Sequence, residues 1–198
     1  MAVIGIDPGR TGAAAVLDED GQILALYSWR PRQRQGRKVL VLDSGEAFQS
    51  SACLGAHLAR RTFCAGFAPD LRRVWCESQY VSKNARTGLT LARSAGMIAG
   101  PILAAQIARG ESAPKSAPSS PVRWIMPSEW RLLVFGSTRR KNREEWKCAA
   151  IEYVAERYGQ TYTSDEAEAI CIALAALNSP KKKGTEKKKG TRKAPANA

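Results

Sequence analysis

The chain has 198 residues, the usual size of one α/β domain, with 44% hydrophobic and 25% charged residues. Its 31 Lys and Arg against 18 Asp and Glu give a net charge of +13, and residues 1–180 still hold 23 cations against 17 acids. A polyanionic partner is therefore favoured over an acidic small substrate. Five cysteines without a CxxC pair, beside a single histidine, argue against a zinc site or a disulfide framework.

The first third of the chain is predicted to begin as an antiparallel meander. Strands are expected at 2–6, 13–17 and 22–29, separated by Pro-Gly and Asp-Gly turn signals. Residues 30–38 hold five cations in nine positions and are expected to form a loop. Apolar residues at helical spacing predict a helix over 43–63.

The rest of the chain alternates strands with helices. We expect a strand at 73–77, a long helix at 84–109, a Ser- and Pro-rich loop at 111–121 and a strand at 122–125. Three helices follow at 128–135, 139–158 and 163–177, the last beginning with a capping box of Thr163 and Glu166. This order predicts an α/β fold: a mixed five-stranded sheet with helices on both faces.

The ends of the chain bound this domain. We expect a single domain over 1–179 and a disordered, Lys-rich tail over 180–198, because the tail has nothing to bury. No run of about 18 apolar residues is present, so no membrane partner is expected. Met1 leads directly into the first strand, which leaves no room for a signal or transit peptide.

Four acids stand where chemistry is expected in such a fold. Asp7 and Glu77 end two apolar strands, and the carboxyl ends of strands face the ligand crevice of α/β sheets. Asp165 and Glu168 are three apart on the last helix and share a face. Grouped carboxylates repel one another unless divalent cations bind, and two Mg²⁺ or Mn²⁺ ions can drive phosphodiester hydrolysis.

Each acid also has a purely structural explanation. Asp7 can start a Pro-Gly turn, Glu77 can be a surface acid, and acids in the first turns of a helix complement its dipole. Their combination in a basic chain is what favours a metal-dependent nuclease.

Three blocks of the sequence resemble the RuvC-type Holliday junction resolvases, members of the RNase H-like nucleases. They are Ile4-Gly5-Ile6-Asp7-Pro8-Gly9, Glu77-Ser78-Gln79-Tyr80-Val81-Ser82-Lys83-Asn84 and Ser164-Asp165-Glu166-Ala167-Glu168-Ala169. The blocks occur in the family's order and span residues 1–177. Glu168 departs from the pattern, since the family more often has Asp there, and the chain is identified as a divergent, phage-type member.

The resemblance implies an RNase H-like fold, a homodimer and paired symmetric nicking of four-way DNA junctions in the cytoplasm of a bacterial or phage-infected cell. It implies two Mg²⁺ (or Mn²⁺) ions, held by Asp7, Glu77, Asp165 and Glu168, and no small-molecule cofactor. Lys147 matches a basic position expected to contact the scissile phosphate, with a solvated helix lysine as the alternative. Tyr80 matches an aromatic near the junction centre, with a half-buried loop residue as the alternative.

Clusters of cations are the expected DNA contacts, because each neutralised phosphate adds a salt-dependent attraction. The candidates are Arg30, Arg32, Arg34, Arg37, Lys38, Lys83, Arg139, Arg140, Lys141 and Arg143. Three other functions compete: an RNase H-like nuclease acting on flaps, forks or RNA–DNA hybrids, a non-catalytic junction-binding protein, and a sugar-kinase-like or actin-like ATPase. The ATPases need about twice this length.

Overall fold

The structure is a computed structural model that describes residues 2–9, 11–34, 36–64, 71–78, 85–108, 122–137 and 142–179. In chain order its elements are β1 (Ala2–Asp7), β2 (Gly12–Leu17), β3 (Ile23–Arg34), β4 (Arg37–Leu42), β5 (Ala47–Phe48), α1 (Ser51–Cys64), β6 (Leu71–Glu77), α2 (Ala85–Ala108), β7 (Val122–Ile125), α3 (Pro127–Phe135), α4 (Arg143–Tyr158) and α5 (Ser164–Asn178).

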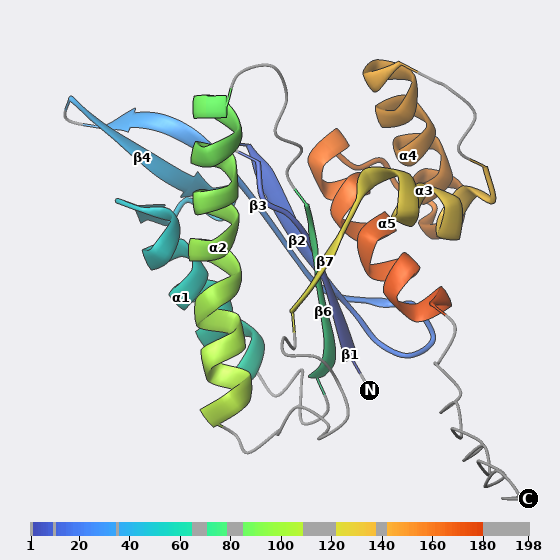
Figure 1. Cartoon of the computed structure of the whole chain (residues 1–198), viewed down its shortest axis with the longest axis horizontal. Helices are drawn as coiled ribbons and strands as arrows, with labels where there is room; N and C mark the ends of the chain where they lie inside the picture. The colour runs from blue at the N-terminus through green and yellow to red at the C-terminus, as the bar shows by residue number, and fades with distance from the viewer. Residues whose placement is uncertain are drawn as a thin grey trace, which may run out of the picture.

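These strands form one mixed sheet in the order β5-β4-β3-β2-β1-β6-β7. Strands β1 to β5 are joined by antiparallel pairings, whereas β6 runs parallel to β1 and β7 runs parallel to β6. Helices α1 and α2 cover one face and α3, α4 and α5 the other (Figure 1). The predicted α/β fold, a mixed sheet with helices on both faces, is confirmed, with seven strands among the described residues in place of the predicted five.

Alternation along the central strands supplies a core to each face of the sheet. Ile4 and Ile6 of β1 pack with Leu54 of α1 and Ile98 of α2. The intervening Val3 faces the opposite way, into a second core that α5 dominates. Both faces of β1 and β2 are fully buried, which is why their sequences are apolar throughout instead of alternating with polar residues.

Helix α5 approaches β1 more closely than a side chain would allow. A Cβ placed on Gly5 would lie 2.3 Å from the backbone oxygen of Ala169 and 2.4 Å from the backbone nitrogen of Ala173. Glycine is therefore required at position 5 by packing, because an added methyl group would meet backbone atoms that cannot move independently. This contact brings the start of α5 to the end of β1.

Both ends of α5 are tied to the sheet. At its N-terminus the predicted capping box is confirmed, with Thr163 and Glu166 as its two members. The Ser28 hydroxyl of β3 lies 2.9 Å from Oε1 of Glu166. Near the other end, Arg73 of β6 donates a 2.6 Å hydrogen bond to the backbone oxygen of Ala176. These contacts fix where the helix sits along the sheet.

The prediction of a loop over residues 30–38 is wrong. These residues form a β-hairpin, in which Gln33 pairs with Lys38 and Gly36 makes the turn with φ 75°. A glycine between two short extended segments indicates a hairpin turn, but the five cations made this segment resemble a solvated loop. The side chains of Arg30, Arg32, Arg37 and Lys38 are exposed at the outer end of the sheet, where charge opposes strand-to-strand aggregation.

The boundaries of two predicted helices also differ. The helix predicted from residue 43 begins at Ser51, because Asp43 accepts hydrogen bonds from Ser28 and Arg30 and residues 47–48 pair with β4. The helix predicted from residue 139 begins at Arg143 in the described residues, with Asn142 as its N-cap. The loop at 111–121 and the tail at 180–198 lie outside the described residues. No helix in the described ranges has the length and apolar character needed to span a bilayer.

We predict that Gly5→Ala destabilises the protein by about 1–3 kcal/mol, because overpacking forces backbone shifts. The measurement is the free energy of unfolding by urea. Gly96→Ala is the matched control: no atom lies within 4 Å of the added methyl, so removing a helix glycine there is expected to stabilise by about 0.5–1 kcal/mol. Equal effects of the two changes would show that α5 tolerates displacement from β1.

Candidate metal site

Asp7 and Glu77 lie at the ends of two neighbouring parallel strands. Ile6 of β1 is opposite Cys76 of β6, and the two acids are the next residues on these strands. The topology therefore places both carboxylates at one edge of the sheet, as the sequence predicts. Asp7 is only 8% exposed, and Glu77 is partly buried.

The start of α5 adds two more carboxylates to this edge. Asp7, Asp165 and Glu168 each offer one oxygen atom, and these three atoms all lie within 4.8 Å of one another. Glu168 is 8% exposed and Asp165 is half-buried. Residues that are far apart in the sequence thus converge on one small, largely buried space.

Burial and repulsion from neighbouring acids disfavour the charged forms of Asp7, Glu77 and Glu168. The pKa of Asp7 is raised well above its ordinary value, first by burial and then by the charges of Glu77, Glu168 and Asp165. Burial, with the charge of Glu168, raises the pKa of Glu77 to about 7. Glu77 lies outside the closest trio of oxygens but inside the same electrostatic field.

This donor set fits a hard divalent cation. Carboxylate oxygens are the ligands that Mg²⁺ and Mn²⁺ prefer, and a cation would remove the repulsion that raises these pKa values. Cys76 precedes Glu77 on β6, and burial, with the charges of Asp7 and Glu77, raises the pKa of its thiol well above the ordinary value. A raised pKa disfavours the thiolate form that binds metals, so carboxylate oxygens are the favoured ligands.

Arg131 of α3 brings a cation to the acids that the sequence analysis did not identify. Its Nη2 lies 3.8 Å from Oε1 of Glu168, and its charge lowers the pKa of Glu77. The guanidinium lies 5.0 Å from the ring centroids of both Trp130 and Trp146. A sequence signal for Arg131 did exist. The helix that contains it was predicted directly after the strand at 122–125, and this strand ends at the same edge of the sheet as Glu77.

Lys147 of α4 also faces the start of α5. Its Nζ lies 4.0 Å from Oδ1 of Asp165 and donates to the Ser164 hydroxyl at 3.4 Å. Arg143, one turn earlier on α4, lowers the pKa of both Glu77 and Glu168 through its charge. Cations from α3 and α4 therefore border the acids on the side away from the sheet.

The hairpin cations are divided between the two faces of the sheet. Strand alternation places Arg30, Arg32 and Arg37 on one face and Lys38 on the other. Nη2 of Arg30 forms an ion pair with Oδ1 of Asp43 at 2.7 Å. The side chains of Arg32 and Arg37 are exposed. Five other predicted DNA contacts lie outside the described residues, as does the side chain of Arg34: Tyr80, Lys83, Arg139, Arg140 and Lys141.

Comparison with known proteins identifies similar structures but no sequence family. No family model matches the chain, and no curated protein matches it. The chain is similar to the Thermus thermophilus RuvC structure, with 21% identity, a TM-score of 0.49 and coverage of 89% of this chain and 94% of the other. It is also similar to T. thermophilus RuvC in complex with a Holliday junction substrate, with 20% identity, a TM-score of 0.48 and the same coverages.

We predict that Glu77→Gln stabilises the metal-free protein more at pH 8 than at pH 5. The pKa of Glu77 is about 7 in the folded protein against 4.5 ordinarily, so its contribution to stability is present below pH 4.5 and lost as the pH rises to 7. The difference between the two pH values is expected to be about 1–3 kcal/mol. Urea unfolding in EDTA measures it, and an advantage independent of pH would contradict the electrostatic account.

Proposed function

We propose that this protein is a divalent-metal-dependent endonuclease that resolves four-way DNA junctions by paired symmetric nicks. The observation that carries the proposal is the convergence of Asp7, Asp165 and Glu168, with Glu77 beside them, in a protein of net charge +13. An acidic site in a basic protein suits a substrate whose backbone is negatively charged and whose cleavage uses bound cations.

Asp7, Glu77, Asp165 and Glu168 would hold the metal ions, two in each site. When bound, the ions activate a water molecule and stabilise the leaving oxygen of the phosphodiester. The protein itself supplies position: Asp7 and Glu77 are fixed by strand ends, and Asp165 and Glu168 by the helix that packs on Gly5. Burial of Asp7 and Glu168 limits the space left for bulk water.

The cations around the acids would hold the DNA backbone. Lys147 and Arg143 lie on α4 and Arg131 on α3, so a phosphate brought to the acids meets positive charge from these helices. Lys147 is half-buried and lies against Asp165, which supports the proposed contact with the scissile phosphate.

The choice of substrate rests on the three sequence blocks that resemble RuvC-type resolvases. The solved structure of one similar protein is a complex of T. thermophilus RuvC with a Holliday junction substrate. Symmetric cutting of a junction needs two active sites related by a two-fold axis, so we propose that the protein acts as a homodimer. A nuclease specific for flaps, forks or RNA–DNA hybrids would share the same acids but need no such symmetry.

We predict that Asp7→Asn and Asp165→Asn each lower the rate of junction cleavage at least 10³-fold, since each removes a charged ligand. The affinity for the junction is expected to be unchanged or up to about threefold higher, because the repulsion between carboxylates and phosphates falls. The measurement is cleavage of labelled synthetic four-way junctions with and without Mg²⁺, together with binding in EDTA. Glu152→Gln, an exposed change on α4, is the control with unaltered cleavage.

The products of the same reaction separate the competing functions. Ligatable nicks at mirrored positions support a symmetric resolvase, whereas cutting of only flaps or hybrids identifies the wider nuclease function. Tight binding without metal-dependent cleavage by the wild-type protein would make it a non-catalytic junction-binding protein.

We predict that Arg32→Gln and Arg37→Gln weaken binding of every duplex or junction by a similar factor. Both side chains are exposed on the hairpin, so their contribution is a sequence-independent attraction to phosphates. Each is expected to reduce the slope of log affinity against log salt concentration by about 0.9. Titrations from 50 to 200 mM salt measure this slope, and an unchanged slope would remove the hairpin from the DNA interface.

A further inference from the structure

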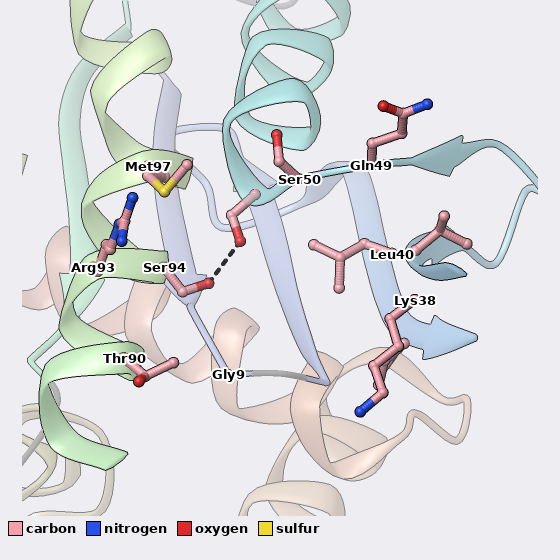
Figure 2. Close-up of a pocket in the computed structure, with 12 residues that line it drawn as sticks. Gly9, Lys38, Leu40, Gln49, Ser50, Thr90, Arg93, Ser94 and Met97 are labelled. Atoms are coloured by element: carbon pink, nitrogen blue, oxygen red, sulfur yellow. Dashed lines mark hydrogen bonds between the residues drawn. The ribbon is translucent and has the colours of Figure 1, made fainter. Parts of the chain in front are cut away.

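A cavity of about 410 Å³ lies between the β3–β4 hairpin, the start of α1 and the side of α2. Its volume is in the range of about 300–1,000 Å³ typical of ligand pockets. Figure 2 shows Met97 and Arg93 on the α2 side of the cavity, Leu40 and Lys38 on the opposite side, and Gly9 between the two sides. None of the described residues that line the cavity is an acid.

The cavity and the acidic site share the turn that follows β1. A Cβ on Gly9 would lie 3.8 Å from Oδ1 of Asp7, so only one residue separates the floor of the cavity from the proposed metal site. The Gly9 backbone amide also lowers the pKa of Asp7 by hydrogen bonding, and the Gly9 carbonyl accepts from Nε1 of Trp29 at 3.3 Å. A DNA strand held at the acids would therefore lie close to one wall of this cavity.

The lining combines two chemistries. Leu40 and Met97 are half-buried and offer apolar contact area to a flat ring. Lys38 and Arg93 are exposed at the opening, and Gln49 supplies an amide that can both donate and accept. An apolar slot bordered by cations is complementary to a base attached to a phosphate.

We infer that this cavity binds one unpaired nucleotide of the DNA strand that crosses the acidic site. The inference deepens the proposed function, on which it rests. The base would lie between Leu40 and Met97, and its phosphate would meet Lys38 and Arg93. Because a paired base cannot leave its helix without cost, the cavity favours DNA with unpaired or easily unpaired bases.

The test uses methionine methyl NMR on the full chain in EDTA, where no cleavage occurs. The chain has three methionines; Met97 lines the cavity, and Met97→Leu assigns its signal. Met126 precedes α3, on the other face of the sheet, and serves as a reference. The probes are pentathymidylate, thymidine 5′-monophosphate, thymidine and inorganic phosphate.

Pentathymidylate is expected to shift the Met97 signal at a concentration at least tenfold lower than the mononucleotide. The double variant Lys38→Gln/Arg93→Gln is expected to weaken this response at least fivefold. Arg60→Gln, an exposed change on α1 that removes one positive charge outside the cavity, is expected to leave it unaltered. Both substituted sites are solvent-exposed, so the variants are expected to fold.

Three results would overturn the inference. The first is no shift of the Met97 signal with pentathymidylate. The second is equal weakening of this response by the double variant and by Arg60→Gln. The third is mononucleotide binding as tight as that of the oligonucleotide. The last result would identify a site for free nucleotides. Junction cleavage by the wild-type protein, assayed separately with Mg²⁺, tests the proposed function, so either idea can fail without the other.

Discussion

Helix α5 lies against β1 at a separation that only a glycine permits, and the geometry of the acidic site depends on that contact. The contact sets the distance between Asp7 on the strand and the two acids on the helix, which share a space 4.8 Å across. A bulkier residue at position 5 would move the helix outward and spread the carboxylates. The buried repulsion among these groups is thus imposed by backbone packing, and flexible side chains cannot relieve it.

The charges around this site form two layers with different effects. Neighbouring acids raise the pKa values of Asp7, Glu77 and Glu168. Arg131 and Arg143 lower the pKa values of both glutamates, and Lys147 lowers that of Glu168. Arg131 is the most confined of these cations, because its guanidinium lies beside both Trp130 and Trp146. Such a cation offsets part of the electrostatic repulsion among the acids.

Local signals made the acidic site predictable from the sequence. Two acids at the ends of apolar strands and a capping box beside two helix acids gave the correct elements, because strand ends and caps depend on neighbouring residues only. The hairpin at 30–38 was missed since its cations resemble a solvated loop, while its pairing depends on β3 and β4 meeting. Arg131 was missed because its contacts with Glu168 and two tryptophans join elements distant in the chain. The predictions at Tyr80, Lys83 and Arg139–Lys141 stay predictions.

The bond from Arg73 to the carbonyl of Ala176 has a consequence for how this protein can vary. With the capping box at one end and this guanidinium near the other, α5 cannot slide along its own axis. A residue inserted between Glu168 and Ala176 would rotate one part of the helix by about 100° relative to the other. Either the anchoring arginine or the acids Asp165 and Glu168 would then lose their register. Insertions are therefore expected to be tolerated only in the connections outside the helix.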